Sequence, residues 1–262
     1  MIPKVIHYCW FGKKSMPEKD RKCIESWKKY CPDHEVVEWN EENYDIHKNE
    51  YMEQAFHAGK WGFVSDYARI DIIYQYGGIY FDTDVELIRS FDVFLDNQMF
   101  CGFENAQYVA FGLGFGAEKG NHYLKELLDE YEKIRFLNAD GTYNLTTCPV
   151  IQTEVLKRHG LVLNNEKQYL DECTVYPSDF FCPKSYRTGK IDITLNTYSI
   201  HHYNMSWRDE NSKKLQLVNQ KLTSRYGARI AKYLLIPFRF YFKMKSVGLK
   251  ECILYAVRKV LK

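Results

Sequence analysis

Asp82 and Asp84 flank a threonine directly after a short apolar run at residues 79–81. On an extended chain, residues two apart point to the same side, so we expect the two carboxylates to lie close together. Neighbouring carboxylates repel each other, and a hard divalent cation that prefers oxygen ligands relieves the repulsion. The pair therefore predicts a site for Mn²⁺ or Mg²⁺, which complete their coordination with water and substrate phosphates.

The residues before this pair predict the helix that leads into it. From Trp61 to Tyr74, apolar side chains recur at spacings of three and four, and two glycines at 77 and 78 then end the run. Asp66 and Arg69 are three apart on this helix and share a face. They form either a surface ion pair, worth only about 0.3 kcal/mol, or part of a binding site.

The beginning of the chain predicts a parallel sheet. Residues 4–10 indicate a first strand, residues 17–30 a helix and residues 35–39 a second strand. A strand, helix and strand at this spacing favour a right-handed parallel unit, and ligands bind at the carboxyl ends of such strands. We therefore expect an α/β fold built on a single Rossmann-type nucleotide-binding sheet. No G-x-G-x-x-G follows the first strand, which argues against a dinucleotide cofactor.

The middle of the chain continues the alternation of strands and helices. Residues 99–104 predict a strand, and residues 111–117 carry glycine at alternate positions, which suits either a sugar lying on the backbone or a tightly packed hairpin. A helix is expected over 119–136 with Asn121 as its cap. A second helix is expected to follow Thr147 as cap, with proline in its first turn.

A late strand over 198–203 brings two adjacent histidines, His201 and His202. A single histidine is more often a hydrogen-bonded core residue than a ligand. Because neutral imidazole also binds Mn²⁺, one of the pair is a candidate third metal ligand beside Asp82 and Asp84, and we favour His202.

Three segments carry a resemblance to a known family. The string SDYARIDIIYQYGGIYFDTDVEL, from Ser65 to Leu87, resembles the signature of the sugar-binding glycosyltransferases that contain a DXD motif. That family, which is similar to glycosyltransferase family 32, includes fungal α-1,6-mannosyltransferases and bacterial capsule and lipopolysaccharide transferases. The clostridial glucosylating toxins are more distantly similar. The opening IPKVIHYCWFG and the late IHHYNMSW are further matches, so the resemblance spans roughly four-fifths of the chain.

The resemblance implies a GT-A-like, retaining, metal-dependent glycosyltransferase. It would move a hexose from a nucleotide diphosphate sugar, a UDP-sugar above all, to a glycan or lipid-linked glycan in surface polysaccharide synthesis. Asp82 would hold the ribose and help to place the metal, and Asp84 would bind the metal directly. Asp66 and Arg69 would hold the sugar hydroxyls. No carboxylate nucleophile is evident in the sequence, so we expect departure and attack on the same face of the sugar.

The same resemblance places further residues at the substrates. Trp10 would stack on the donor base, Tyr67 would contact substrate, and Ser206 with Trp207 would close over the donor. Relatives often have threonine, glycine and proline at the start of the acceptor-side helix, where this chain has Cys148 in place of the glycine.

Two other classes of function remain open, and the first of them could use the same aspartates. A metal-dependent hydrolase of nucleotide sugars or phosphoesters would release free sugar at a rate indifferent to acceptor. A non-catalytic, membrane-associated scaffold would bind neither UDP nor Mn²⁺. Modification of host proteins, as by the toxins, is less favoured because this polar chain is short and shows no accessory domain.

Composition agrees with a folded protein. The chain has 262 residues, of which 45% are hydrophobic and 27% charged, a globular composition. Its eight cysteines contain no C-x-x-C pair and predict free thiols in a reducing cytosol. Neither a signal peptide nor a membrane-spanning apolar run is evident.

The end of the chain differs in charge from the rest. Residues 229–262 hold nine Lys or Arg and one acid, a net +8, which leaves −6 on residues 1–228. We therefore expect a glycosyltransferase domain over 1–228 and a basic, amphipathic helical tail over 229–262. Apolar residues interleaved with the charges favour an anionic membrane surface, and the protein would lie in the cytoplasm, peripheral to the inner face of the cell membrane. Packing against the catalytic domain is the alternative; nucleic acid ranks lower because no recognition motif accompanies the charges.

Overall fold

The computed structural model describes residues 1–204 and 210–248 of the chain, which forms two compact units. Unit 1 comprises Met1–Pro183 and Asp192–His202, and unit 2 comprises Lys184–Ile191 and Tyr203–Lys262. The domain boundary predicted at residue 228 falls inside helix α7 (Glu210–Leu234), beside Gly227, where the helix turns.

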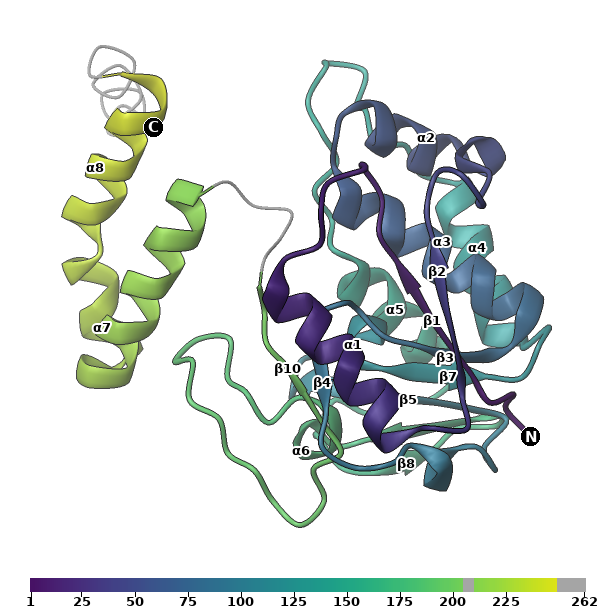
Figure 1. The fold of residues 1–262 in the computed structure, drawn as a ribbon. Coiled ribbons are helices and arrows are strands. Elements are labelled where there is room, and N and C mark those ends of the chain that lie inside the picture. Colours follow the sequence, from purple (N-terminus) through teal and green to yellow (C-terminus); the bar gives the residue numbers. More distant parts are fainter. Residues whose placement is uncertain (205–209, 249–262) are drawn as a thin grey trace. The chain divides into compact units, whose positions relative to one another are not determined.

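Unit 1 is built on a mixed sheet with the order β2-β1-β3-β7-β5-β9-β8, and Figure 1 labels all of these strands except β9. Its strands are β1 (Val5–Cys9), β2 (Glu35–Trp39), β3 (Gly78–Tyr80), β5 (Met99–Asn105), β7 (Phe115–Ala117), β8 (Gln168–Tyr169) and β9 (Cys173–Tyr176), with β6 (Tyr108–Val109) paired to β5. Neighbours β2-β1, β1-β3 and β5-β9 are parallel, and β7 runs antiparallel to both β3 and β5. The α/β fold class predicted from the sequence is confirmed, including the parallel β1-α1-β2 unit.

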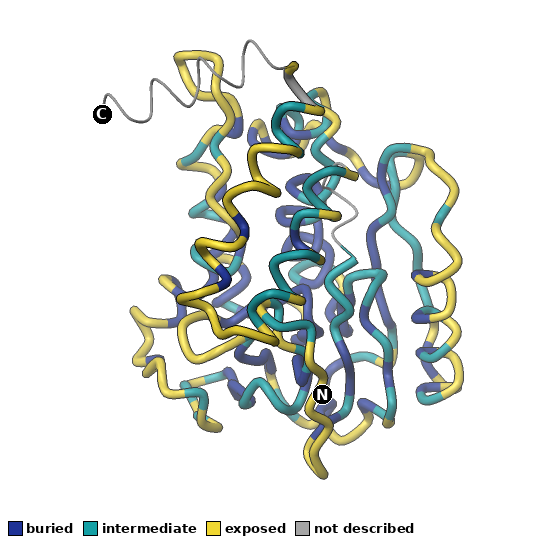
Figure 2. Tube along the Cα trace, turned by 90° about the vertical axis from the view of Figure 1, so that its left-hand side faces the viewer, coloured by how far each residue is buried: buried dark blue, intermediate teal, exposed yellow. Residues whose placement is uncertain are grey.

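Helices pack on both faces of this sheet. The helices of unit 1 are α1 (Glu18–Tyr30), α2 (Glu50–His57), α3 (Trp61–Tyr76), α4 (His122–Glu132), α5 (Cys148–Arg158) and α6 (Ser178–Phe181), with short 3₁₀ turns at η1 (Ile46–Lys48), η2 (Asp92–Phe94) and η3 (Phe111–Leu113). Helices α2 to α5 share one hydrophobic core with the sheet. Trp27 of α1 and Phe181 of α6 pack among the aromatic rings on the other side, around Phe81 and Phe91. The central strands β3, β5 and β7 and the helix α3 are mostly buried. Figure 2 shows such buried segments, in dark blue, in the interior.

The turn between α3 and β3 needs its two glycines. Gly77 caps α3 with φ +70° and Gly78 follows with φ +105°, a region that side chains rarely adopt. A Cβ atom at Gly78 would also lie 2.7 Å from the carbonyl oxygen of Val5. The close approach of β1 and β3 therefore depends on glycine, and it sets where the chain leaves β3 toward the aspartates.

Two short strands continue the chain beyond the sheet edge. Strand β4 (Val85–Leu87) pairs antiparallel with β10 (Ser199–His201), His201 lying opposite Val85. On its other side, α1 holds β4 by two bonds: the indole nitrogen of Trp27 donates to Val85 O at 2.7 Å, and Leu87 N donates to Ser26 Oγ at 2.8 Å. The aspartates thus stand between two well-anchored strands, β3 and β4.

Three expected elements differ from the structure. The helix expected over 119–136 is the shorter α4, which Asn121 caps by accepting a hydrogen bond from Tyr123 N. The glycine-containing run at 111–117 divides into η3 and β7 instead of one strand, because Gly114 turns the chain at φ +128°. Thr147 stands at the N-cap of α5 but makes no side-chain capping bond.

Unit 2 is mainly helical in its described part. Helix α7 is broken by the non-helical Gly227, and α8 (Ile236–Val247) follows at once. The loop at 184–191 joins this unit because Gln216 and Gln220 of α7 both donate side-chain hydrogen bonds to Tyr186 O. Across the residues that the structure describes, no helix combines the length and the apolar character needed to span a membrane. The tail residues 249–262 lie outside the described range.

Candidate functional site

The two aspartates occupy a tight turn between β3 and β4. Val85 N donates to Asp82 O at 3.0 Å, which closes the turn over Thr83 and Asp84. The expectation of extended backbone at this point is wrong, since the chain reverses here. The turn nevertheless brings the carboxylates together: one ligand atom each from Asp82, Asp84 and His201 lie within 4.8 Å of one another.

The histidine that faces the aspartates is His201, and not the expected His202. His201 Nε2 lies 3.1 Å from Asp84 Oδ1, with 13% of each side chain exposed. His202 Nε2 lies 2.7 Å from Glu86 Oε2, while its backbone N–H donates to Asp84 O. Adjacent residues of a strand point to opposite sides, so only one of the two imidazoles can reach the aspartates. The geometry supports His201 as the third ligand.

The charge of Asp84 acts on the ionisation of His201. Burial alone would lower the pKa of His201, but the Asp84 carboxylate raises that pKa well above its usual value. The raised pKa favours a proton on His201 while no cation is bound, and a cation held there would displace this proton, because only the neutral imidazole binds a metal.

Asp66 and Arg69 of α3 join the aspartate turn through one buried network. Arg69 Nη2 lies 2.9 Å from Asp66 Oδ1 and 3.3 Å from Asp82 Oδ1. Only 4% of the Arg69 side chain and 11% of the Asp66 side chain are exposed. A solvated surface ion pair is therefore excluded. Burying a guanidinium costs desolvation free energy unless its N–H groups donate hydrogen bonds. Here those hydrogen bonds fix the direction in which both carboxylates point.

Two residues of the sheet support this network. Tyr80 donates its hydroxyl hydrogen to Asp82 Oδ1 at 3.2 Å, and the Arg69 guanidinium lies 5.1 Å from the centre of the Tyr80 ring. Gly112 of η3 accepts a backbone bond from Asp82 N. A Cβ atom at Gly112 would lie 2.2 Å from Asp82 Oδ2 and 2.8 Å from Arg69 Nη1, so any side chain there displaces the network.

The start of α5 closes the network on the side of Asp66. Cys148 is the first residue of that helix, and its thiol donates a hydrogen bond to the Asp66 carboxylate. Burial raises the pKa of Asp66 to about 6, against the opposing charge of Arg69. Cys148 is thus part of the site's inner wall.

The structure describes two of the four expected substrate residues. Trp10 follows β1 and is half-buried; its indole nitrogen donates to Lys14 O at 2.6 Å. Trp10 lies at the same carboxyl edge as Asp82, because β1 and β3 are paired in parallel up to His7 and Tyr80. Tyr67 is buried in the core, with its ring 5.8 Å from that of Tyr131, and is turned away from solvent. Ser206 and Trp207 lie outside the described residues.

Sequence reasoning missed Tyr80 and Gly112 as residues of the site. It named His201 only as the less favoured member of the histidine pair, and it placed Cys148 at the acceptor side and not beside Asp66. The period of two along β3 could have suggested Tyr80, because Tyr80 and Asp82 are two apart. Nothing local could have suggested Gly112, which is thirty residues from Asp82 in the sequence.

Comparison with known proteins assigns the segment that carries most of this site. Residues 17–101 match the family described as "Glycosyltransferase sugar-binding region containing DXD motif". The DXD region, as we now call it, contains Asp66, Arg69, Asp82 and Asp84, so the resemblance noted at Ser65–Leu87 is confirmed.

Two curated relatives match between a third and two fifths of the chain. Two inositol phosphoceramide mannosyltransferases of Schizosaccharomyces pombe are similar over 106 residues each: number 1 is 29% identical and number 3 is 32% identical. The matches cover 38% and 36% of this chain, and 33% and 27% of the two enzymes. The chain thus spans about a third or less of the length of the relatives that it matches.

Two solved structures are similar over a larger part of the chain. The PaToxG glycosyltransferase, 19% identical with a TM-score of 0.45, covers 60% of this chain and 69% of its own. A glycosyltransferase involved in glycosylation of the major capsid of PBCV-1, 11% identical with a TM-score of 0.40, covers 77% of this chain and 95% of its own.

The donor atoms beside the DXD region fit a divalent cation. Two carboxylates and one imidazole converge, a set that suits Mn²⁺ or Mg²⁺ with water and phosphate oxygens in the remaining positions. Asp84 and His201 present ligand atoms with little exposure, and Asp82 is more open, with 29% of its side chain accessible. A ligand can therefore approach from the side of Asp82.

Proposed function

We propose that the protein is a retaining glycosyltransferase that moves a hexose from a nucleotide diphosphate sugar, in first place a UDP-sugar, to a glycan or lipid-linked glycan in surface polysaccharide synthesis. The observation that carries the proposal is the buried Asp66–Arg69–Asp82 network that adjoins the Asp84–His201 pair. Its acids and its arginine are arranged for a ligand that has both hydroxyl groups and a diphosphate.

The protein groups divide the work in this proposal. Asp82, Asp84 and His201 would hold Mn²⁺ or Mg²⁺, which neutralises charge on the departing diphosphate when bound. Arg69 keeps its guanidinium in place by bonding two carboxylates and is thereby prepared to meet donor oxygens without reorganisation. Asp66, once ionised, accepts hydrogen bonds from sugar hydroxyls.

The low exposure of Asp66 and Arg69 also supports transfer over hydrolysis. A group that is nearly excluded from water offers its hydrogen bonds to the sugar, while few solvent molecules reach the same place. The match of the curated mannosyltransferases, whose names give a lipid as acceptor, supports a lipid-linked acceptor for this chain as well.

The test is a panel of UDP- and GDP-hexoses with Mn²⁺ in which nucleotide release is measured with and without candidate glycan acceptors. We expect one donor to be turned over, with the rate increased by acceptor. Asp84→Ala should lower this rate at least a hundredfold, because it removes one charged ligand. Asp129→Ala, at an exposed position of α4, is the matched control and should keep the rate.

Two results would contradict the proposal. Full activity of Asp84→Ala would remove the metal role of the DXD turn. Release of free sugar at a rate that no acceptor changes would make the protein a hydrolase.

A further inference from the structure

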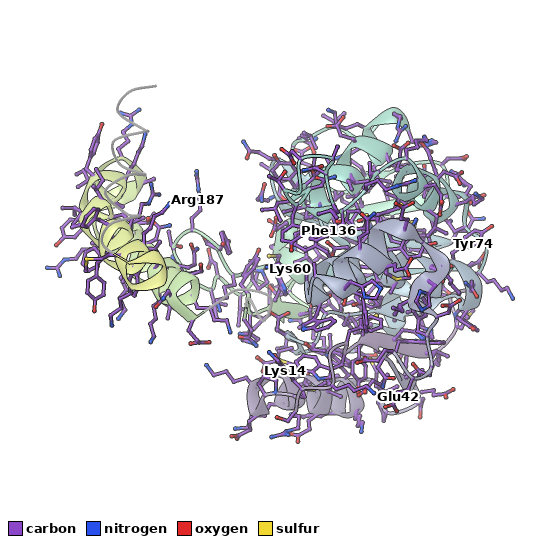
Figure 3. All side chains as sticks on the ribbon, turned by 90° about the horizontal axis from the view of Figure 1, so that it is seen from above. Lys14, Glu42, Lys60, Tyr74, Phe136 and Arg187 are labelled. Atoms are coloured by element: carbon purple, nitrogen blue, oxygen red, sulfur yellow. The ribbon has the colours of Figure 1, made fainter. Side chains whose placement is uncertain are left out.

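The helices of unit 2 expose an unusual number of large apolar side chains. In the described range 210–247, these are Leu217, Tyr226, Ile230, Tyr233, Leu234, Ile236, Phe238, Phe240 and Tyr241. Tyr233 is 69% exposed. Figure 3 shows side chains on several sides of the green and yellow helices of unit 2. Apolar surface that stays together in this way usually marks a contact with a partner or a membrane.

The same helices are strongly basic. Residues 210–247 contain nine Lys or Arg and a single acid, Glu210. Ion pairing cannot cancel this charge within the segment, because one carboxylate faces nine cations. A partner that covers the apolar surface must therefore be anionic or must tolerate high positive charge.

Part of the charge and part of the apolar surface form two neighbouring stripes along one helical stretch, while Ile236 falls among the basic residues. Leu235 N donates to Ala231 O and Arg239 N donates to Leu235 O, so helical spacing is maintained from α7 into α8. The basic residues at 229, 232, 239 and 243 are separated by three, seven and four and share one side. The apolar residues at 230, 233, 237 and 241 are separated by three, four and four and form the neighbouring stripe.

An apolar hollow adjoins the apolar stripe and shares Pro237 and Tyr241 with it. It measures about 440 Å³ and is lined by Val218, Pro237, Phe238, Tyr241 and Phe242 of α7 and α8. Its lining is almost free of polar surface. An acyl chain could enter such a hollow without leaving a polar group unsatisfied.

We propose that α7 and α8 of unit 2 dock on the surface of an anionic lipid bilayer. The apolar stripe enters the interface, tyrosines lie at headgroup level, and the basic stripe meets the phosphates and serine headgroups. A lipid surface is favoured over nucleic acid because it accounts for the apolar stripe and the hollow as well as the charge. The proposal does not depend on the transferase activity.

The test is partition of the full chain into sedimented vesicles. Vesicles of phosphatidylcholine alone are compared with vesicles containing about 30% phosphatidylserine. We expect binding only to the anionic vesicles, and release in about 0.5 M NaCl.

A charge-removal variant locates the surface. Replacing Arg229→Gln, Lys232→Gln, Arg239→Gln and Lys243→Gln together should weaken partition at least tenfold, since each basic side chain near an anionic surface contributes about a fivefold change. The matched control removes four lysines of α1, by Lys19→Gln, Lys22→Gln, Lys28→Gln and Lys29→Gln, and should change partition less than twofold. Far-UV circular dichroism checks that both variants keep their helices.

The apolar stripe has its own variant. Tyr233→Ser with Tyr241→Ser should also weaken partition, while leaving the charge unchanged. Equal loss in the α1 control, unchanged partition in the fourfold variant, or equal binding to neutral vesicles would each overturn the proposal. Binding to duplex RNA or DNA as tight as to anionic vesicles would overturn it in favour of a nucleic-acid surface, and salt-independent dimers in light scattering would overturn it in favour of a second copy.

Discussion

His201 and His202 offer a matched pair for testing the metal site at the level of single residues. His201→Ala removes an imidazole 3.1 Å from Asp84, whereas His202→Ala removes one that bonds Glu86. We expect the Mn²⁺ concentration for half-maximal turnover to rise at least tenfold in His201→Ala and less than threefold in His202→Ala. A titration of rate against Mn²⁺ measures both, and a larger change in the second variant would restore the first expectation from the sequence.

The choice between these histidines could not be made from the sequence because it depends on the register of β10. His201 lies opposite Val85 in the pairing of β10 with β4, and a shift of one residue would exchange the two imidazoles. The sequence shows that a histidine pair follows a strand, but pairing partners more than a hundred residues away decide which one turns toward Asp84.

His7 carries a pH dependence of stability. Its Nδ1 accepts from Trp39 Nε1 and its Nε2 donates to Gly77 O, each at 3.0 Å, which requires the neutral ring. Burial lowers the pKa of His7 to about 4 from 6.5. The contribution of His7 to the free energy of unfolding is therefore fully present above pH 6.5 and is lost as the pH falls toward 4. The reason is that His7 is protonated at a higher pH in the unfolded chain than in the folded protein. At about pH 5 the loss should reach about 2 kcal/mol.

Urea unfolding at several pH values measures this loss. His7→Gln cannot ionise and retains a donor for Gly77 O. The fall in unfolding free energy between about pH 6.5 and pH 5 should therefore be about 2 kcal/mol smaller in the variant than in the wild type. The same pH slope in both proteins would assign the acid sensitivity to other groups.

At the level of elements, the contact of α1 with β4 positions the DXD turn from outside the site. Trp27→Phe would leave Val85 O without its indole donor, and Ser26→Ala would leave Leu87 N without its acceptor. Each should cost about 1–3 kcal/mol of stability. Because Val85 directly follows Asp84, we also expect the Mn²⁺ requirement to rise at least threefold.

Trp39→Phe is the matched control, since it also removes one indole hydrogen bond, but the bond joins His7 and not β4. Thermal unfolding and Mn²⁺ titration of the three variants separate loss of stability from loss of positioning. Equal Mn²⁺ requirements in all three would show that β10 alone holds β4 in place.

Elements with local signals were predicted well, and contacts between distant elements were not. Strand β2 was expected at its observed residues, and Gly77 was expected as the cap of α3, because spacing and glycine conformation act within a few residues. The aspartate turn was misjudged because Gly112 and β4, not the sequence around Asp82, determine the backbone there. The contact of α1 with β4 was not predicted either. The sequence pattern around Ser26 and Trp27 indicates a helix, but it does not indicate which strand that helix packs against.

At the scale of the whole molecule, the two units carry opposite charge. Unit 2 holds seventeen Lys or Arg and three Asp or Glu, a net +14, which leaves −12 on unit 1. The total of +2 therefore conceals a strong separation of charge. The net charge changes sign nearer to the boundary between the two compact units than to residue 228, the boundary expected from the sequence. The reason is that several basic residues of unit 2 lie before residue 228.

Ligand binding should be visible in the thermal unfolding of the full chain. The DXD turn and His201 both lie in unit 1, as do four of the five tryptophans, at positions 10, 27, 39 and 61. UDP with Mn²⁺ at a hundred times the dissociation constant should stabilise this unit by about 2.7 kcal/mol. For a unit of this size the tryptophan-monitored midpoint should rise by about 8 °C.

The same measurement distinguishes metal-linked binding from binding of the base alone. Asp84→Ala should abolish the rise in midpoint, because the cation links the diphosphate to the turn. Removal of Mn²⁺ by a chelator should do the same in the wild type. If UDP raises the unfolding midpoint equally in the presence of the chelator, the edge of β1 near Trp10 holds the nucleotide without the cation. Asp84 and His201 would then have no part in holding the diphosphate.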